Sequence, residues 1–282
     1  MAMSSVLDAH SPSADIDLSI LIPTFHREKT VVEAVRSVLA DSTLRIEVIV
    51  ADDSPEGSAA DAMAAIVDPR VRYLVRDQPT GGFPARVRND LVKLSRGRYL
   101  YFLDDDDTVS LATLTRIVSH MKAANVRVGV GKVCPFGPEG SQVVEEEREH
   151  YRRARLRFLM RPSKFEVATR LMFEPSLVCC SACVIRRDAF EAIGGFHTHL
   201  PLYEDVDMYI RAIRGYGYVY VDQDFLHRRT GETSLIQNER DLRRSVESYQ
   251  LMYQSYRKQY SGLEWLLLRL WAIVLRKRPV EA

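Results

Sequence analysis

A run of four aspartates, Asp104 to Asp107, directly follows the apolar residues YLYFL. Neighbouring carboxylates repel one another, and partial burial adds a desolvation cost, so the run needs a positive partner or the protonation of some members. Carboxylate oxygens clustered on a short loop suit a hard divalent cation, Mg²⁺ or Mn²⁺, that keeps positions open for phosphate oxygens. The alternative is that one or two of them cap the helix expected from near Val109. Capping a helix needs only one or two acids, so a run of four favours the metal site.

A second acidic group, Glu204, Asp205 and Asp207, stands at the start of the helical pattern YEDVDMYIRAIRGYG. The helix dipole favours acids in the first turn of a helix, which is the simpler interpretation from residue types alone. A carboxylate in this place can also act as a general base that takes the proton of an attacking hydroxyl. The residue types leave both interpretations open.

The elements that must position these acids alternate between strands and helices. Short apolar runs predict strands at 18–23, 46–54, 71–75 and 98–104. Apolar residues at helical spacing follow each of them, so the pattern predicts βαβ units and a mostly parallel sheet. In such sheets, ligands bind beyond the carboxyl ends of the strands. We therefore expect Thr24, Asp52, Asp53 and the aspartate run to converge on one edge.

After residue 134 this rhythm ends. The pattern predicts a further strand at 176–185, a last strand at 218–222 and helix throughout 236–282. Three of the four cysteines, Cys179, Cys180 and Cys183, fall in the first of these segments. Their spacing does not suit a zinc site, so we expect buried, reduced thiols.

Composition and charge are those of a soluble globular protein. The 282 residues include 39 basic and 38 acidic side chains, and this net charge of +1 gives no reason to expect a nucleic-acid partner.

Residues 1–16 lack the features of a secretory signal and are predicted to be a disordered leader. No apolar run reaches the roughly 18 residues of a membrane-spanning helix. Reduced thiols fit the cytoplasm best.

Five segments occur in the order and spacing found in family 2 glycosyltransferases, which this sequence resembles. They are SILIPTF, EVIVADDS, ARVRND, YLYFLDDDD and GGFHTHLPLYEDVDMYIR, and the resemblance covers about residues 17–232. It implies the GT-A fold, an α/β fold with a Rossmann-like, mostly parallel sheet flanked by helices. The implied organisation is a nucleotide-sugar-binding half over 17–134, an acceptor-binding half over 135–235 and a helical C-terminal extension over 236–282.

The resemblance also implies roles for individual residues. The implied contacts with the nucleotide-sugar donor come from Pro23, Thr24, Phe25, Asp52, Asp53, Arg88, Asp104 and Asp105. The implied ligands of Mg²⁺ or Mn²⁺ are Asp104 and Asp106, which form the D-x-D motif, with Asp107 and His227. The tetra-aspartate run leaves the choice of ligands open by one position. Asp205, with Glu204 beside it, is the implied catalytic base, and in-line attack aided by one base predicts inversion at the anomeric carbon.

The function implied is a metal-dependent transfer of a sugar from a nucleotide sugar, carrying UDP or dTDP with GDP left open, to a hydroxyl acceptor. The expected acceptor is a growing bacterial cell-surface glycan or a lipid-linked saccharide. One alternative is a sugar-nucleotide nucleotidyltransferase, but its Gly/Lys-rich phosphate loop is replaced here by PTFHREKT after the first strand. Another is a non-catalytic nucleotide-sugar-binding protein, which we would expect to have lost an acid.

The segment 263–278, LEWLLLRLWAIVLRKR, is apolar apart from Glu264, Arg269 and a terminal basic cluster. It is too short to span a bilayer, and its two tryptophans suit the headgroup level, so a helix lying in the membrane interface is predicted. The alternative is a helix packed on the catalytic domain or on a second copy in a homodimer. The expected location is the cytoplasm, with peripheral association at the inner face of the cytoplasmic membrane.

Overall fold

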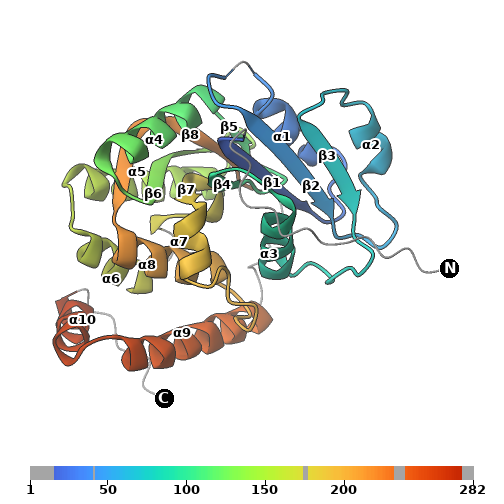
Figure 1. The fold of residues 1–282 in the computed structure, drawn as a ribbon. Helices are drawn as coiled ribbons and strands as arrows, with labels where there is room; N and C mark the ends of the chain where they lie inside the picture. The colour runs from blue at the N-terminus through green and yellow to red at the C-terminus, as the bar shows by residue number, and fades with distance from the viewer. Residues whose placement is uncertain (1–15, 41, 174–176, 232–238, 275–282) are drawn as a thin grey trace.

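The computed structural model describes residues 16–40, 42–173, 177–231 and 239–274, so the predicted leader lies almost entirely outside the described residues. One eight-stranded sheet, flanked by helices, has the order β3-β2-β1-β4-β7-β6-β8-β5 (Figure 1). The strands are β1 (Leu18–Thr24), β2 (Ile46–Asp52), β3 (Val71–Val75), β4 (Tyr99–Phe102), β5 (Thr108–Val109), β6 (Val128–Phe136), β7 (Cys183–Arg186) and β8 (Tyr218–Arg229).

The predicted mostly parallel sheet is confirmed. Strand β1 pairs in parallel with β2 and β4, β2 with β3, and β6 with β8. Strand β7 is antiparallel to both β4 and β6 and so joins the two parallel parts, while β5 is antiparallel to β8. The apolar runs of β2 and β4 are buried along their whole length, as expected for strands covered on both faces.

Helices connect the strands and cover the sheet. They are α1 (Thr30–Ser37), α2 (Ala60–Ala64), α3 (Pro84–Leu94), α4 (Leu111–Ala124), α5 (Gln142–Leu159), α6 (Lys164–Phe173), α7 (Arg187–Ala192), α8 (Glu204–Tyr216), α9 (Glu239–Gln259) and α10 (Gly262–Val274). Helix α3 begins with Pro84 in its first turn, and its buried face carries Arg88 beside Leu91 and Val92. A buried guanidinium needs acidic partners, and the site supplies them.

Three predicted segments differ from the structure. The last strand, expected at 218–222, continues to Arg229 as β8. The strand expected at 176–185 is formed only over Cys183–Arg186, and a 3₁₀ turn at Cys180–Ala182 precedes it. The reason is that Ser181 is drawn to β4: its carbonyl accepts from the Tyr101 hydroxyl at 2.7 Å, and its Oγ accepts from Asp104 N at 3.0 Å. All four cysteines are free thiols, as predicted.

The C-terminal segment is helical, as predicted, over the described residues 239–274, where it forms two helices, while 236–238 and 275–282 lie outside the described residues. The helix is interrupted at Ser261, which forms a capping box at the start of α10. Ser261 Oγ accepts from Glu264 N at 3.3 Å, and a Glu264 carboxylate oxygen accepts from Ser261 N at 2.9 Å. The reciprocal cap starts a new helix and lets α10 turn back toward α6 at the end of α9 (Figure 1).

Candidate active site

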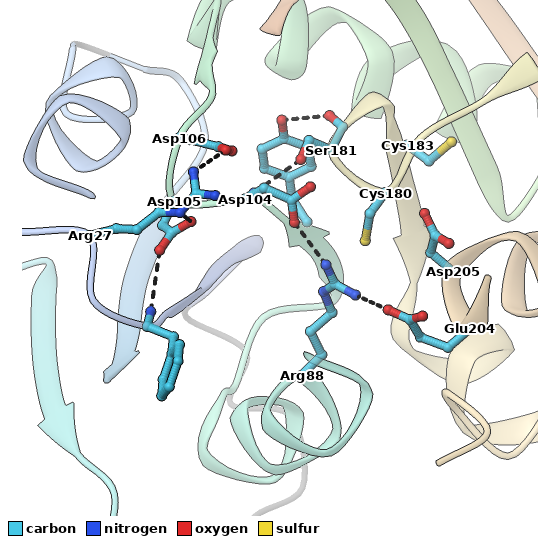
Figure 2. Close-up of polar contacts among 12 residues, drawn as sticks. Arg27, Arg88, Asp104, Asp105, Asp106, Cys180, Ser181, Cys183, Glu204 and Asp205 are labelled. Carbon is cyan, nitrogen blue, oxygen red and sulfur yellow. Dashed lines mark hydrogen bonds and ion pairs between the residues drawn. The ribbon is translucent and has the colours of Figure 1, made fainter. Parts of the chain in front are cut away.

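The aspartate run lies at the end of β4, and its carboxylates turn toward different partners (Figure 2). Arg88 Nη2 donates to Asp104 at 2.8 Å, and Arg27 Nη1 donates to Asp106. Arg27 also lies 3.9 Å from Asp105. The positive partners of the aspartate run, which the sequence did not identify, are therefore two arginines. Arg27 was not among the residues predicted from the sequence, where its only signal is its place in the loop that follows β1.

Three further contacts anchor the run to strand ends on either side. The Thr24 hydroxyl donates to Asp105 at 2.7 Å, and Phe25 N lies 3.4 Å from the same carboxylate oxygen. On the other side, Arg229 N donates to Asp107 at 2.9 Å. The run is thus held between the ends of β1 and β8, and the convergence predicted for Thr24 is present.

Burial makes negative charge on the run costly. Burial raises the pKa of Asp105 to about 7, even though Thr24 donates a hydrogen bond to it. The pKa of Asp106 is also raised, first by burial and then by the charge of Asp104, and burial raises that of Asp107 well above its usual range. A cation bound at the run would favour the ionised form of these carboxyls and offset the cost of their burial.

The residues present fit a divalent cation that is shared with a substrate. Within the described part of the chain, no group of three or more His, Cys, Asp or Glu side chains is arranged to hold a metal ion by itself. Magnesium, however, is commonly held by one or two carboxylates together with substrate phosphates. The carboxylate oxygens of Asp104 and Asp106 suit that arrangement, and a bound cation would compete with Arg88 and Arg27 for them.

His227 lies on β8, paired with Thr108 of β5. On β6 its register partner is Cys134. The β8 residue that contacts the aspartate run is instead Arg229, whose Nε donates to the Asp106 carbonyl at 3.1 Å. The role of His227 as a metal ligand stays a prediction.

Asp53 shapes a glycine-containing turn next to the run. Its carboxylate accepts from Thr80 N at 2.8 Å, from the Thr80 hydroxyl at 2.6 Å and from Gly82 N at 2.9 Å. Arg76 Nε lies 3.0 Å from the same carboxylate. A Cβ on Gly82 would lie 3.6 Å from the ring of Phe25, so this turn passes close to an aromatic side chain that is 37% exposed.

The phenyl ring of Phe25, with the half-buried Pro23 before it, is open to a flat ligand such as a nucleotide base. Asp53 acts on the region around Phe25 only by holding the turn that contains Thr80 and Gly82. These positions are compatible with the predicted donor contacts, which stay predictions.

Asp52 has a structural role in this structure. One oxygen accepts from Ser54 N and from the Ser54 hydroxyl, and the other accepts from Ala59 N at 2.9 Å and from the Tyr73 hydroxyl at 2.6 Å. A carboxylate accepts about four hydrogen bonds, so both oxygens are saturated. The side chain is fully buried. The expectation that Asp52 contacts the donor is therefore corrected, because its geometry leaves no free acceptor.

The ED pair, Glu204 and Asp205, opens α8 after a strained residue. Tyr203 has φ of 61° in the left-handed region, which a tyrosine adopts only when its surroundings enforce it. Asp205 Oδ1 accepts from Val206 N at 2.8 Å. Burial and then the charge of Glu204 raise the pKa of Asp205 to about 6. Asp205 is therefore a stronger base than an ordinary aspartate and still ionised at neutral pH.

Arg88 brings the two acidic groups into one site. Its Nη1 donates to Glu204 at 2.7 Å while its Nη2 donates to Asp104 at 2.8 Å, across 116 and 16 residues of sequence (Figure 2). The resemblance implied that Arg88 approaches the base or diphosphate of the donor. In the structure it spans the two acidic groups instead, and its side chain is only 6% exposed.

Two thiols line the same site. Figure 2 shows Cys180 and Cys183 on the segment beside Asp205. Burial raises the pKa of both thiols well above the usual range, so they are neutral and add an apolar wall next to the carboxylate. Their cluster was visible in the sequence, but its place beside Asp205 was not.

The Asp207 carboxylate has a structural role rather than a catalytic one. It accepts from Arg211 Nη2 at 2.6 Å and from the Tyr256 hydroxyl at 2.6 Å, and His197 Nδ1 lies 3.0 Å away. Tyr256 belongs to α9, so this carboxylate ties the helix of the ED pair to the C-terminal extension. Of the three acids in the first turn of α8, Asp205 is the one free to accept a proton.

Helix α9 also holds the turn that precedes the ED pair. Ser248 Oγ accepts from Leu202 N at 2.9 Å, and the hydroxyls of Tyr203 and Ser245 lie 3.0 Å apart. The rings of Tyr203 and Tyr249 are in contact, with centroids 5.1 Å apart. These contacts supply the surroundings that keep Tyr203 in its left-handed conformation.

We expect Tyr256→Phe to lower the free energy of unfolding by about 1.5–3 kcal/mol, because a buried hydrogen bond to a charged carboxylate is lost. Thermal unfolding followed by circular dichroism would measure this loss. Tyr253→Phe is the matched control, since Tyr253 lies on the same helix and packs its ring on Trp265. Equal stability of the two variants would contradict the part assigned to Tyr256.

Known protein families, sequences and solved structures resemble this chain. The family model described as "Glycosyl transferase family 2" matches residues 19–194. The succinoglycan biosynthesis protein ExoO of Rhizobium meliloti is 34% identical over 124 residues, which are 44% of this chain and 35% of that protein. The β-1,3-glucosyltransferase WfaP of Escherichia coli is 29% identical over 109 residues, covering 39% of this chain and 43% of that protein. The matched region is thus less than half of each of these relatives.

Among solved structures, S. aureus TarS 1–349 in complex with UDP-GlcNAc superposes with a TM-score of 0.59 at 18% sequence identity. The match covers 83% of this chain and 65% of that chain. At this identity the likeness concerns the fold, and it confirms the predicted GT-A-type architecture.

Proposed function

This chain belongs to glycosyl transferase family 2, and we propose that it moves a sugar from a nucleotide sugar to a hydroxyl group of an acceptor. The observation that carries the proposal is Arg88, which contacts Asp104 of the aspartate run and Glu204 of the ED pair. A candidate diphosphate site and a candidate base are thereby neighbours, as an attack on the carbon that bears the diphosphate requires.

We propose a UDP-sugar as the donor. Support comes from two relatives: WfaP is named for the use of UDP-Glc, and TarS was solved with UDP-GlcNAc and with UDP. On this chain the base would lie against Phe25, near the turn that Asp53 holds, and the diphosphate would lie toward the aspartate run. Asp104 and Asp106 would hold Mg²⁺ or Mn²⁺, which when bound stabilises the negative charge that develops on the departing diphosphate.

Asp205 accepts the proton of the acceptor hydroxyl while the hydroxyl oxygen forms its bond to the anomeric carbon and the bond to the diphosphate breaks. A single displacement of this kind inverts the anomeric configuration. The apolar wall of Cys180 and Cys183 keeps water from Asp205, so its basicity is directed to a bound hydroxyl. A nucleotidyltransferase would leave Asp205 and Glu204 without a role.

The proposed acceptor is a saccharide of a bacterial surface glycan, carried on a lipid. WfaP is named for an acceptor on diphosphoundecaprenol, and ExoO for succinoglycan biosynthesis. A lipid-linked acceptor is presented at a membrane surface, so a chain that uses it gains from association with that surface.

The test is a panel of UDP- and dTDP-sugars with the purified full chain, read by thermal shift and by release of the nucleoside diphosphate. We expect one or more UDP-sugars to raise the melting temperature in the presence of Mn²⁺ and to release UDP slowly to water. If no nucleotide sugar binds in any metal condition, the proposed function is wrong.

We expect Asp53→Asn to weaken binding of UDP by about tenfold or more while changing kcat much less. An amide cannot accept all the hydrogen bonds from Thr80 and Gly82, and it removes the charge paired with Arg76, so the turn beside Phe25 loosens. Calorimetric titration of UDP measures the change. Asp61→Asn, on the surface of α2, is the control. A variant with unchanged UDP affinity but low kcat would contradict this role.

A further inference from the structure

Helix α10 has two apolar faces, and only one of them packs on the protein. Leu268 and Ala272 are buried, and Trp265 packs on Tyr253 with ring centroids 4.6 Å apart. The guanidinium of Arg170 lies 4.9 Å from the ring centroid of Trp271. The tryptophans were expected at the level of lipid headgroups, but in the structure both contact the protein. The predicted alternative, a helix packed on the catalytic domain, is therefore present on this face.

The opposite face is a row of aliphatic side chains that has no partner among the described residues. This face, called the α10 stripe below, consists of Leu263 (68% exposed), Leu266 (54%), Leu267 (39%), Leu270 (49%) and Ile273 (71%). At 100° per residue these positions fall within an arc of about 120°, so they form one continuous strip. Single exposed leucines are common, but a contiguous strip of five marks an interaction surface.

Charge distinguishes the candidate occupants of the stripe. Arg269 is exposed at one edge of the arc, and the sequence continues with Arg276, Lys277 and Arg278. The one acidic residue of α10, Glu264, is turned to the protein side, where Arg214 donates to it at 2.6 Å. An apolar strip flanked by basic residues alone is the pattern of a helix that lies in the interface of an anionic bilayer.

Size favours the same occupant over a second copy of the chain. Five partly exposed aliphatic side chains present on the order of 500 Å², whereas a stable protein interface covers about 800 Å² on each partner. Among the described residues, no helix is long and apolar enough to cross a membrane.

We propose that the α10 stripe docks the protein on an anionic lipid surface, with α10 parallel to the membrane and its buried face on α6 and α9. Because lipid binding needs neither donor nor acceptor, it is measured separately from the proposed sugar transfer. Failure of one therefore leaves the other standing.

The experiment is sedimentation of the full chain with large vesicles of phosphatidylcholine alone or with about one third phosphatidylglycerol, at low salt. We expect binding to the anionic vesicles, and at least a tenfold loss in the double variant Leu266→Gln, Leu270→Gln. Both side chains are exposed, so the variant keeps the buried face of α10. The matched control is Val67→Gln, Leu156→Gln, which removes exposed aliphatic groups at 96% and 45% exposure elsewhere on the surface.

Arg269→Gln should weaken binding to anionic vesicles by about fivefold and leave binding to neutral ones unchanged, since each basic residue near such a surface contributes on the order of 1 kcal/mol. Three results would overturn the proposal: no binding to anionic vesicles at low salt, equal binding by the stripe variant, or a wild-type dimer in solution that the stripe variant converts to monomer without any vesicle binding. The last result would assign the stripe to a second copy.

Discussion

Asp205→Asn is expected to lower kcat by on the order of three or more decades while leaving the affinity for the donor and for the cation unchanged. The amide has the shape of the carboxylate but cannot take a proton, so the acceptor hydroxyl loses its base. The donor-binding groups proposed at Phe25, Asp53 and the aspartate run lie outside α8 and keep their contacts. The measurement pairs the rate of sugar transfer with calorimetric titration of the UDP-sugar.

Asp188→Asn serves as the control, because Asp188 is 55% exposed on α7 and pairs with Arg186 away from the site. It should transfer sugar at the wild-type rate. A wild-type rate in Asp205→Asn would move the role of base to Glu204, which would then have to leave its contact with Arg88. Asp207 is a poorer substitute, because its oxygens are held by Arg211 and Tyr256.

The pH profile gives the same assignment a second readout. The pKa of Asp205 is raised to about 6 by burial and by Glu204, so the base form is lost as the pH falls through that value. The charged groups that face Asp205 are Glu204 on α8, Arg88 on α3 and Asp104 on the aspartate run. We expect kcat/KM to fall at least tenfold for each pH unit below about 6. In Asp205→Asn this limb should become shallower, since only the protonation of Asp105 and Asp106 would still lower the residual rate.

The second large effect is expected at the aspartate run. Removal of the cation with excess EDTA, or Asp106→Asn, should reduce turnover by at least three decades and weaken the binding of UDP, because the diphosphate loses the charge that holds and stabilises it. The fold should persist, with a melting temperature within a few degrees of the wild type, since the ion pair of Asp106 with Arg27 is partly exposed and such pairs contribute little to stability. Activity assays and thermal unfolding measure the two effects.

Addition of Mn²⁺ after EDTA should restore the wild-type rate but not that of Asp106→Asn. Asp68→Asn is a suitable control because its carboxylate pairs with Arg70 outside the site. Full activity in excess EDTA would rule out the cation. Arg27, which already pairs with Asp106, would then be the candidate for neutralising the diphosphate.

The sequence predicted the elements that carry the chemistry because those depend on local patterns. Strands β1, β2 and β4 are mostly apolar, interrupted by Ser19 in β1 and Glu47 in β2. The aspartate run follows the end of a strand, and the ED pair stands at the start of a helix. The parallel order of these strands follows from the helices between them. The convergence of Thr24 with the aspartate run follows from that order.

The contacts inside the site could not be predicted, because they join residues far apart in the chain. Arg88 and Glu204 are separated by 116 residues, and Asp207 and Tyr256 by 49. The direction in which each aspartate side chain of the run points depends on its own hydrogen-bond or ion-pair partner. The neighbouring acids in the sequence do not indicate that partner. Asp52 was misjudged for the same reason, since only the folded turn shows that its oxygens are used by Ser54, Ala59 and Tyr73.

A crystal structure of the protein soaked with UDP and Mn²⁺ tests the central claim, that the aspartate run and the ED pair form one nucleotide-sugar site. We predict an anomalous manganese peak about 2.1–2.3 Å from a carboxylate oxygen of the run and from diphosphate oxygens. The uracil should lie against Phe25, and the free end of the diphosphate should point toward Asp205. UDP bound elsewhere on the molecule, or bound at this site at full affinity without any metal peak, would contradict the claim.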